Sequence, residues 1–403
     1  MRQTDAVSHV TVEEHRAAIA RVLRRRAAQS VAPDRLALGR RLCADLAAAD
    51  DLPRFDNSAM DGYAVSPAYP DQREFPVVGD IAAGDPADFR LEVGQAARIM
   101  TGARVPDGAT AVVPVERTDA APTGPAPQHV TVRGDVEPGQ QIRRRGEDSA
   151  AGEVIASAGS CVTPGLIALS RSAGVTALQV HARTGVAVVA TGAELTGLGR
   201  DPGQGGIHES NSEMIAALAT RAGCDVVRVE TCTDDPEVLR GLLDELAADD
   251  RIDLVITTGG VSEGAYEVVR QVGTSLGTFD FVHLAMQPGG PQGLGTYAGT
   301  PVVALPGTPT GAFVSFVMLL RPGLDLVHGV PPRQPGTAVY AGRPRRARRG
   351  KLQYLTSVLG PDGSVRSGDA HHLTALARAN ALIEVPYEVD QLLEGDVVTV
   401  HHL

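Results

Sequence analysis

The sequence predicts a multidomain α/β protein whose largest domain contains a doubly wound parallel sheet. Three observations support this: buried β-branched runs, helical patterns between them, and loops rich in Gly, Thr and Pro where the runs end. The clearest run covers residues 253–258 and continues into Gly259, Gly260 and Ser262. An apolar run between an acid and a glycine pair is typical of a parallel strand buried on both faces.

Four further runs predict the rest of this sheet, at 185–190, 225–231, 279–286 and 301–305. Helical patterns alternate with them, at 211–222, 236–248, 266–276 and 311–327. Strands and helices that alternate at this spacing are typical of right-handed crossovers and a parallel sheet. We therefore expect one α/β domain over residues 181–330.

The loops after these strands predict a ligand site, because the carboxyl ends of parallel strands share the edge where α/β proteins bind ligands. Glycines let the backbone approach a ligand closely, and consecutive amides can bind an anion. Packing alone would explain one such loop. Several together indicate a pocket for a large, oxygen-rich anion, and they lie at 191–195, 258–264, 287–291 and 306–311.

The remaining residues predict three smaller domains. Short strands and turns indicate a β-rich inserted domain over 62–139. This domain interrupts a helical and mixed linking domain made of 8–61 and 140–180. Strand-like runs separated by turns indicate a β-barrel-like domain over 331–403.

Two short motifs near the N-terminus predict local structure. Thr11, followed three residues later by Glu14, predicts the capping box of a helix. The polar segment 56–61 precedes Gly62 and is flanked by aromatic residues and methionine. It is either a turn that caps a strand, as Asn and Asp commonly do, or a loop that holds the Asp61 carboxylate rigidly.

Composition excludes several classes of function. The chain of 403 residues is long enough for about two to four domains. Its net charge of −11 argues against nucleic-acid binding, and its four cysteines show no spacing typical of zinc sites or disulfides. The start of the chain lacks a signal pattern, and no apolar run reaches about 18 residues. We therefore expect a cytoplasmic protein that does not insert into membranes.

Segment 52–65, LPRFDNSAMDGYAV, resembles the signature of molybdopterin molybdenumtransferases, the MoeA family related to the E domain of gephyrin. The resemblance extends over almost the whole chain in the family's order, through 79–84, 99–103, 145–148, 191–195, 234–236, 258–264 and 305–307. It implies an elongated, four-part protomer in a homodimer, with 8–61 and 140–180 also serving dimerisation. It implies that the α/β domain binds molybdopterin.

The resemblance further implies a reaction in which molybdate is inserted into adenylated molybdopterin with Mg²⁺ and release of AMP. It leaves open whether a molybdopterin adenylyltransferase docks as a partner. Attack on the phosphoanhydride of a dianionic ligand needs charge neutralisation, which a metal held by carboxylates can supply. In the family, the segments of Asp61 and Thr101 complete the cleft from the partner subunit.

The family-matching loops contain the candidate site residues. The expected catalytic residues are Asp61, Glu194, Asp235 and Glu267. The expected metal ligands are Asp61, Asp148, Glu194 and Glu267. The expected ligand-binding residues are Thr101, Thr191, Gly192, Thr258, Gly259, Gly260, Ser262, Gln287, Pro288, Pro306 and Gly307. For Glu194 an alternative stays open, namely an acid in the first turn of a helix that complements the helix dipole.

Several ligand-facing positions depart from the family pattern. The family's lysines are replaced by His283, Gln287 and Gly290. This removes attraction for phosphate and molybdate, and a histidine with a reference pKa of about 6.5 replaces it only in part at neutral pH. Ala265 replaces an acid, Glu267 an aspartate and Ala370 a serine, and 305–311 differs from the family's Leu-Pro-Gly-Asn-Pro-Val-Ser.

Two functions are compatible with these departures. The first is an active molybdenumtransferase with an altered anion site, and the retained Asp61 and Thr101 segments favour it. The second is a catalytically weakened, gephyrin-like paralogue that acts as a dimeric scaffold for a protein partner, and the lost lysines favour it. We prefer the transferase.

Overall fold

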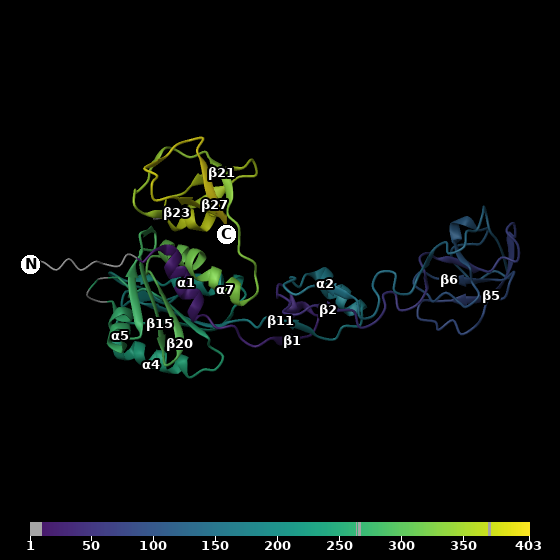
Figure 1. Cartoon of the computed structure of the whole chain (residues 1–403), viewed down its shortest axis with the longest axis horizontal. Coiled ribbons are helices and arrows are strands. Elements are labelled where there is room, and N and C mark those ends of the chain that lie inside the picture. The colour runs from purple at the N-terminus through teal and green to yellow at the C-terminus, as the bar shows by residue number, and fades with distance from the viewer. Residues whose placement is uncertain (1–9, 263, 265–266, 370–371) are drawn as a thin grey trace, which may run out of the picture. The chain divides into compact units, whose positions relative to one another are not determined.

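The computed structural model describes residues 10–262, 264, 267–369 and 372–403. Ala265, Ala370 and Glu263, named in the family comparison above, lie outside this described part. The chain forms two compact units (Figure 1). The terminal unit contains the residues up to Gln29 together with His181–Leu403, and the central unit contains Ser30–Val180.

The terminal unit is built on a six-stranded sheet with the order β15-β12-β16-β20-β19-β17. Four strands run parallel to one another: β15 (Asp225–Cys232), β12 (Gly185–Thr191), β16 (Leu254–Thr258) and β20 (Thr300–Leu305). All residues of β12 and β16 are buried, as their unbroken apolar sequences predict. The predicted α/β class is confirmed.

The far edge of the sheet differs from the expected parallel arrangement. β19 (Pro291–Tyr297) is an unpredicted strand that pairs antiparallel with both β20 and β17 (Phe279–His283). The prediction of one strand over 279–286 is wrong, because Met286–Gln287 forms a separate strand, β18, that pairs with β23 of the C-terminal sheet. The continuous segment 279–287 thus contributes one strand to each of two sheets in the terminal unit.

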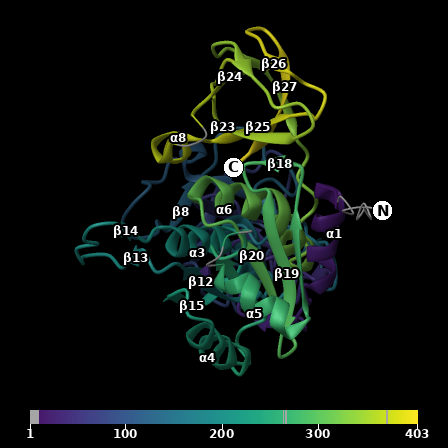
Figure 2. The same cartoon turned by 90° about the vertical axis from the view of Figure 1, so that its left-hand side faces the viewer.

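Helices cover both faces of the sheet (Figure 2). Alternate residues of β12 point to opposite faces, since Val186 and Val188 belong to one core and Ala187 and Val189 to the other. The first core is completed by α1 (Val12–Val22), α3 (Asn211–Arg221) and the helical segment Pro309–Val327. The second is completed by α4 (Pro236–Ala247) and α5 (Val268–Leu276).

The N-terminus of α1 has the predicted capping box. The Glu14 amide donates to Thr11 Oγ1 at 3.1 Å, and the Thr11 amide donates to Glu14 Oε2 at 2.8 Å. These two bonds satisfy donors that the first turn of a helix leaves without partners.

The expectation that no apolar segment reaches membrane-spanning length is wrong at one place. Pro309–Val327 is a helical segment of 19 residues, made of α6 (Pro309–Ser315), a π-helical turn (Phe316–Leu320) and α7 (Arg321–Val327). An 18-residue window within it has a mean hydropathy of 1.4, but 83% of that window is buried inside the protein. This burial is what a core helix requires.

The C-terminal part of the terminal unit is a closed five-stranded barrel, which confirms the predicted β-barrel-like domain. Its strands are β21 (Gly336–Tyr340), β23 (Leu352–Leu359), β24 (Ser364–Ser367), β25 (Ala381–Val385) and β27 (Val397–His402). The pairing of β23 with β25 closes the barrel. A short antiparallel pair, β22 (Arg345–Arg346) with β26 (Gln391–Leu392), and a helix, α8 (Leu373–Arg378), complete this part.

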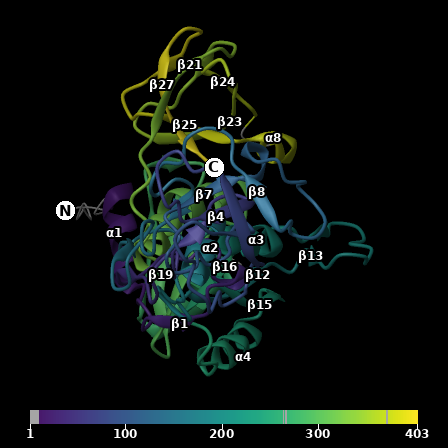
Figure 3. The ribbon, with the colours of Figure 1, turned by 90° about the vertical axis from the view of Figure 1, so that its right-hand side faces the viewer.

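The central unit contains a five-stranded sheet with the order β7-β4-β6-β5-β8. Its strands are β4 (Gly62–Val65), β5 (Glu74–Ile81), β6 (Ala96–Ile99), β7 (Ala111–Pro114) and β8 (His129–Thr131), of which β4, β7 and β8 are labelled in Figure 3. Both faces of this sheet carry an apolar core. The rest of the unit includes α2 (Pro164–Ser172) and two 3₁₀ turns (Arg35–Ala37 and Val115–Arg117). It also includes three short strand pairs, β1 (Gln29–Val31) with β11 (Leu178–Val180), β2 (Leu46–Ala47) with β10 (Val154–Ala156), and β3 (Asn57–Ser58) with β9 (Ile142–Arg143).

Candidate functional site

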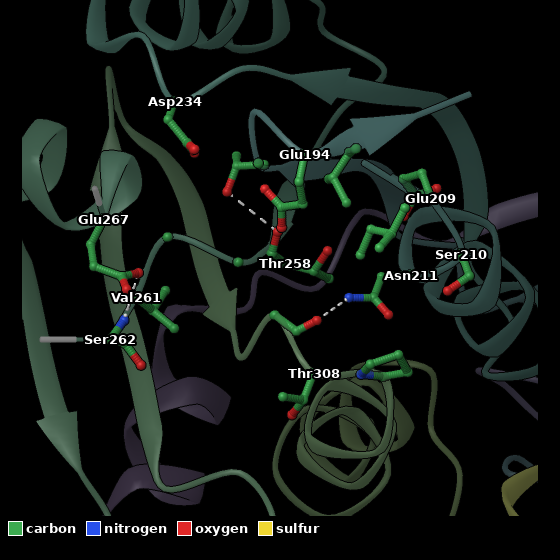
Figure 4. Close-up of a pocket in the computed structure, with 18 of the residues that line it drawn as sticks. Glu194, Glu209, Ser210, Asn211, Asp234, Thr258, Val261, Ser262, Glu267 and Thr308 are labelled. Atoms are coloured by element: carbon green, nitrogen blue, oxygen red, sulfur yellow. Dashed lines mark hydrogen bonds between the residues drawn. The ribbon is translucent and has the colours of Figure 1, made fainter. Parts of the chain in front are cut away.

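A cavity of about 460 Å³ lies at the carboxyl ends of the four parallel strands, wholly within the terminal unit. Its lining includes Thr191 and Gly192 at the end of β12, Asp234 after β15, the segment 258–262 at the end of β16, and 307–309 after β20 (Figure 4). This is the edge at which open α/β sheets bind ligands, and the volume suits a small-molecule ligand.

The glycines of this edge bring three loops into contact. Gly259 and Gly260 have φ values of +92° and +67°, a left-handed conformation that other residues rarely adopt. A Cβ atom at Gly259 would lie 2.5 Å from the Thr191 carbonyl oxygen, and one at Gly307 would lie 3.3 Å from the Gly259 Cα. The backbone therefore needs glycine at Gly259, both for its conformation and for its close contact with the loop after β12.

Four carboxylates line the cavity, and three of them accept hydrogen bonds from backbone amides. Asp234 Oδ2 accepts from the Ala193 amide at 2.9 Å, and Glu267 Oε2 accepts from the Ser262 amide at 2.9 Å. Glu209 accepts from the Ser212 amide at 2.8 Å. The carboxylate of the fourth, Glu194, accepts no hydrogen bond within the described part of the chain, and it lies over Gly192.

The N-termini of two helices also face the cavity. Ser210 and Asn211 begin α3, and Thr308 and Pro309 begin the helical segment Pro309–Val327. Neither cap residue, Ser210 nor Thr308, uses its hydroxyl to cap its helix. Helix N-termini present positive partial charge to an anion. At α3 the Ser212 amide is already bonded to the Glu209 carboxylate, so the start of the segment Pro309–Val327 is the end that suits an anionic group of a ligand.

Two buried polar atoms in the lining lack partners. Asn211 donates through Nδ2 to the Gly307 carbonyl at 2.6 Å, which leaves Oδ1 without a donor. Thr258 is 1% exposed, and its Oγ1 likewise has no partner among the described residues. Buried polar groups normally form hydrogen bonds, so these atoms indicate that a ligand with polar groups completes the site.

The structure brings most of the predicted terminal-unit residues together. The cavity lining contains Thr191, Gly192, Glu194, Thr258, Gly259, Gly260, Ser262, Glu267 and Gly307. Asp235 is not in the lining, because its carboxylate caps α4 by accepting from the amides of Glu237 at 2.8 Å and Val238 at 3.4 Å. Its neighbour Asp234 lines the cavity instead. Pro306, Gln287 and Pro288 also lie outside the lining.

The other predicted residues belong to the central unit. Asp61 precedes β4, and its Oδ1 accepts from both the amide and the hydroxyl of Thr101, each at 2.6 Å. The hydroxyl of Thr101, followed by its amide, lowers the pKa of Asp61, which keeps the carboxylate ionised. Asp148 is exposed, and its amide donates to the Leu52 carbonyl at 3.0 Å.

The three positions at which the resemblance leads us to expect lysines are His283, Gln287 and Gly290. A Cβ atom at Gly290 would lie 2.8 Å from Nε2 of His283, so the imidazole occupies the space that a side chain at Gly290 would need. Gln287 has a buried Oε1 that lacks a partner among the described residues. Among the described residues that line the cavity, none is a lysine or an arginine.

Sequence reasoning missed Asp234, His208, Glu209, Ser210 and Asn211 as lining residues. A signal for Ser210 and Asn211 exists in the predicted crossover. A helix that follows a buried strand through a loop begins at the carboxyl edge of the sheet, and the start of the helix at 211 was predicted correctly. Nothing in the spacing distinguishes Asp234 from Asp235.

Within the described residues, no group of three or more His, Cys, Asp and Glu side chains is arranged to hold a metal ion. Mg²⁺ usually binds through one or two carboxylates together with substrate phosphates and water. The free carboxylate of Glu194 and the neighbouring Asp234 fit that mode, since Asp234 is bonded to Ala193, the residue before Glu194.

Family models match most of the chain. The model described as the MoeA N-terminal region (domain I and II) matches residues 10–174. The probable molybdopterin binding domain matches 187–325, and the MoeA C-terminal region (domain IV) matches 338–403. The cavity residues from Thr191 to Pro309 lie inside the second match.

Curated proteins and solved structures agree with these matches. Molybdopterin molybdenumtransferase 2 of Mycobacterium tuberculosis is 42% identical over 98% of this chain and 99% of its own length. Molybdopterin molybdenumtransferase of Haemophilus influenzae is 30% identical over 89% of this chain and 90% of its own. A molybdopterin biosynthesis MoeA protein from Pyrococcus horikoshii has a TM-score of 0.79 at 26% identity, with 98% of each chain covered. The chain therefore belongs to the molybdopterin molybdenumtransferases, the MoeA family of enzymes in molybdenum cofactor biosynthesis.

Proposed function

We propose that the chain inserts molybdenum from molybdate into adenylated molybdopterin and releases AMP. The cavity of about 460 Å³, its two helix N-termini and its glycine loops support this substrate class. The unpartnered Asn211 Oδ1 and Thr258 Oγ1 would pair with polar hydrogens of the pterin or the nucleotide. Both atoms are already buried, so a hydrogen bond from the ligand would satisfy them without a further burial cost.

The single observation that carries the proposal is the convergence of glycine loops at the carboxyl ends of the four parallel strands, and the charge of the cavity adds the requirement for a cation. Four carboxylates line the cavity, and its described lining contains no lysine or arginine. A phosphoanhydride and molybdate are anions, so such a site would repel them unless a cation binds as well. We propose that Mg²⁺ is this cation and that Glu194 and Asp234 hold it. When bound, it would offset the charge on the phosphate oxygens.

The protein's own groups would then bind and orient the substrate. The amides of Gly260 and Val261 in the loop after β16 and the start of α6 would hold anionic oxygens. Glu267 keeps the Ser262 amide in place through its 2.9 Å hydrogen bond. We propose that Glu267 positions the glycine loop, and the metal ligation suggested by the sequence stays a prediction for it.

We further propose a cytoplasmic homodimer in which Asp61 and Thr101 of one subunit complete the cavity of the other. The ionised Asp61, held by two hydrogen bonds from Thr101, supports a functional role for this pair. The four cysteines are free, as is usual in a reducing compartment. A docking molybdopterin adenylyltransferase would be a consistent source of the adenylated substrate.

The gephyrin-like scaffold is the second candidate. The observation that favours it is the same lack of lysine and arginine in the described lining, together with His283 and Gly290 at lysine positions. A scaffold would keep the fold and bind a protein partner without releasing AMP. The two candidates therefore differ in one measurable product.

The test measures AMP released by the purified protein from adenylated molybdopterin, with molybdate and a titration of Mg²⁺. We expect AMP release that requires Mg²⁺ and falls by about a hundredfold in Glu194→Gln, since a lost metal ligand affects the chemical step directly. Glu237→Gln, an exposed acid on α4 outside the cavity, is the matched control and should keep full activity. Absence of AMP release by the unaltered protein would overturn the transferase and leave the scaffold.

A further inference from the structure

Two further cavities lie in the terminal unit, and the residues that line them are not used by the proposed reaction. The smaller, of about 30 Å³, is lined by Leu218, Arg221, Ala222, Phe316, Arg321 and Arg333. The larger, of about 510 Å³, shares Arg321 and Arg333 with it. Three arginines from three different segments thus converge on one small space.

The arginines have too few acidic partners. Arg333 Nε pairs with Asp325 Oδ2 at 3.0 Å, and Asp325 is 4% exposed. No ion pair within the described residues involves Arg221 or Arg321. One carboxylate against three guanidinium groups leaves two positive charges in excess. Like charges held this close repel each other, and half-burial of Arg321 strengthens that repulsion.

Arg321 also lacks an acceptor. It begins α7 inside the helical segment Pro309–Val327, and its Nε is buried without a hydrogen-bond partner among the described residues. Burial, followed by the charge of Arg333, lowers the pKa of Arg321, in keeping with a charge that protein groups do not compensate. A guanidinium offers donors in a planar fork that matches an oxyanion, and buried donors are normally satisfied.

We infer that Arg221, Arg321 and Arg333 bind a small oxyanion of the phosphate type. The anion supplies the missing acceptor for Arg321 and offsets the excess positive charge. Because Arg333 lies in the segment between α7 and β21, the bound anion ties that segment to the ends of α3 and α7. The site stands apart from the proposed reaction and does not depend on it.

The larger cavity decides whether the anion is free or part of an organic molecule. Beyond the two shared arginines, its lining is mostly apolar and includes Met318, Pro322 and Tyr354. Its lining also contains three acids, Glu13, Asp325 and Glu384. Asp325 is paired with Arg333 at 3.0 Å and Glu384 with His401 at 2.8 Å, so the charged group of a ligand is expected at the arginines, away from Glu13. An organic phosphate could place its charged group on the arginines and its body in this cavity.

The test is calorimetric titration of the full chain with sodium phosphate and with phenyl phosphate at constant ionic strength. We expect saturable binding that becomes at least tenfold weaker in Arg321→Met. We expect a smaller loss in Arg221→Gln, because the side chain of Arg221 is exposed. Phenyl phosphate that binds more tightly than phosphate would assign the larger cavity to an organic body, and equal affinities would assign the site to the free ion.

Arg240→Gln is the matched control, since this arginine on α4 lines neither cavity and pairs with Glu237 at 3.7 Å. Its phosphate affinity should equal that of the unaltered protein. Binding that persists unchanged in Arg321→Met and Arg221→Gln, or no saturable binding of either compound, would overturn the inference. No pterin is present, so the outcome is independent of the AMP measurement.

Discussion

Gly259 shows how one residue determines the shape of the candidate site. Its φ of +92° lies in the left-handed region, and a Cβ there would lie 2.5 Å from the Thr191 carbonyl oxygen. Gly299, in the turn between β19 and β20, has a similar φ of +88°, but a Cβ there would have no neighbouring atom within 4 Å. Both glycines therefore adopt a positive φ that other residues rarely adopt. They differ because a Cβ atom would clash with a neighbouring loop at Gly259 and would meet no atom at Gly299.

We expect Gly299→Ala to destabilise the protein by about 1–2 kcal/mol, the usual effect of a left-handed non-glycine residue. Gly259→Ala should destabilise it more and abolish AMP release, because the loop after β16 must move away from Thr191. Denaturant unfolding and the AMP assay of both variants check this. Equal stability of the two variants, or normal AMP release by Gly259→Ala, would contradict the role given to this contact.

At the scale of elements, two adjacent acids at the start of α4 have different environments. Asp235 caps α4 with hydrogen bonds to two amides, whereas Asp234 lines the cavity and accepts from Ala193. Both acids lie in one family-matching motif, so the sequence does not distinguish them. Their surroundings differ because Asp235 is the N-cap residue of α4. The catalytic role predicted for Asp235 is better proposed for Asp234.

We expect Asp235→Asn to keep stability and activity, since Asn caps helices as well as Asp does. Asp235→Ala should lose about 1 kcal/mol of stability and retain most AMP release. Asp234→Asn should instead raise the Mg²⁺ concentration needed for half-maximal AMP release while leaving stability nearly unchanged. An Asp235→Asn variant as inactive as Asp234→Asn would show that Asp235 takes part in the chemistry.

At the scale of the whole molecule, the predicted site residues are divided between two units. Glu194 and the cavity belong to the terminal unit, whereas Asp61, Thr101 and Asp148 belong to the central unit. A two-fold dimer can combine the surfaces of two chains at one site, and each site then needs one residue set from each subunit. The proposed homodimer makes this a requirement for activity.

We expect Asp61→Asn and Glu194→Gln to be inactive separately and to regain activity when the two chains are co-expressed. Half of the random dimers are mixed, and each mixed dimer has one intact site, so about a quarter of the normal activity should return. A chain with both substitutions, co-expressed with Asp61→Asn, is the control and should stay inactive. No recovery in the first mixture would argue that each site is built from a single subunit.

The α/β class, the run of parallel strands and the helix starts were predictable because they depend on local periodicity. β12 and β16 are unbroken apolar runs, and α1 carries its capping box in the letters Thr11 and Glu14. The glycine loops were also predictable from local sequence, because glycine adopts a positive φ more readily than other residues do. Family membership likewise followed from short motifs such as 52–65.

Other features depend on which segments meet, and local sequence does not contain that information. The strand predicted at 279–286 is split, because Met286–Gln287 pairs with β23 of the barrel. Nothing near Asp234 or Asp235 distinguishes the residue that lines the cavity from the one that caps α4. The convergence of Arg221, Arg321 and Arg333 joins residues far apart in the chain. The sequence by itself determined the family and the elements that follow from local periodicity. The tertiary structure decided strand β19, the split at Met286 and which charges share a space, because electrostatic and packing energies depend on distance in space.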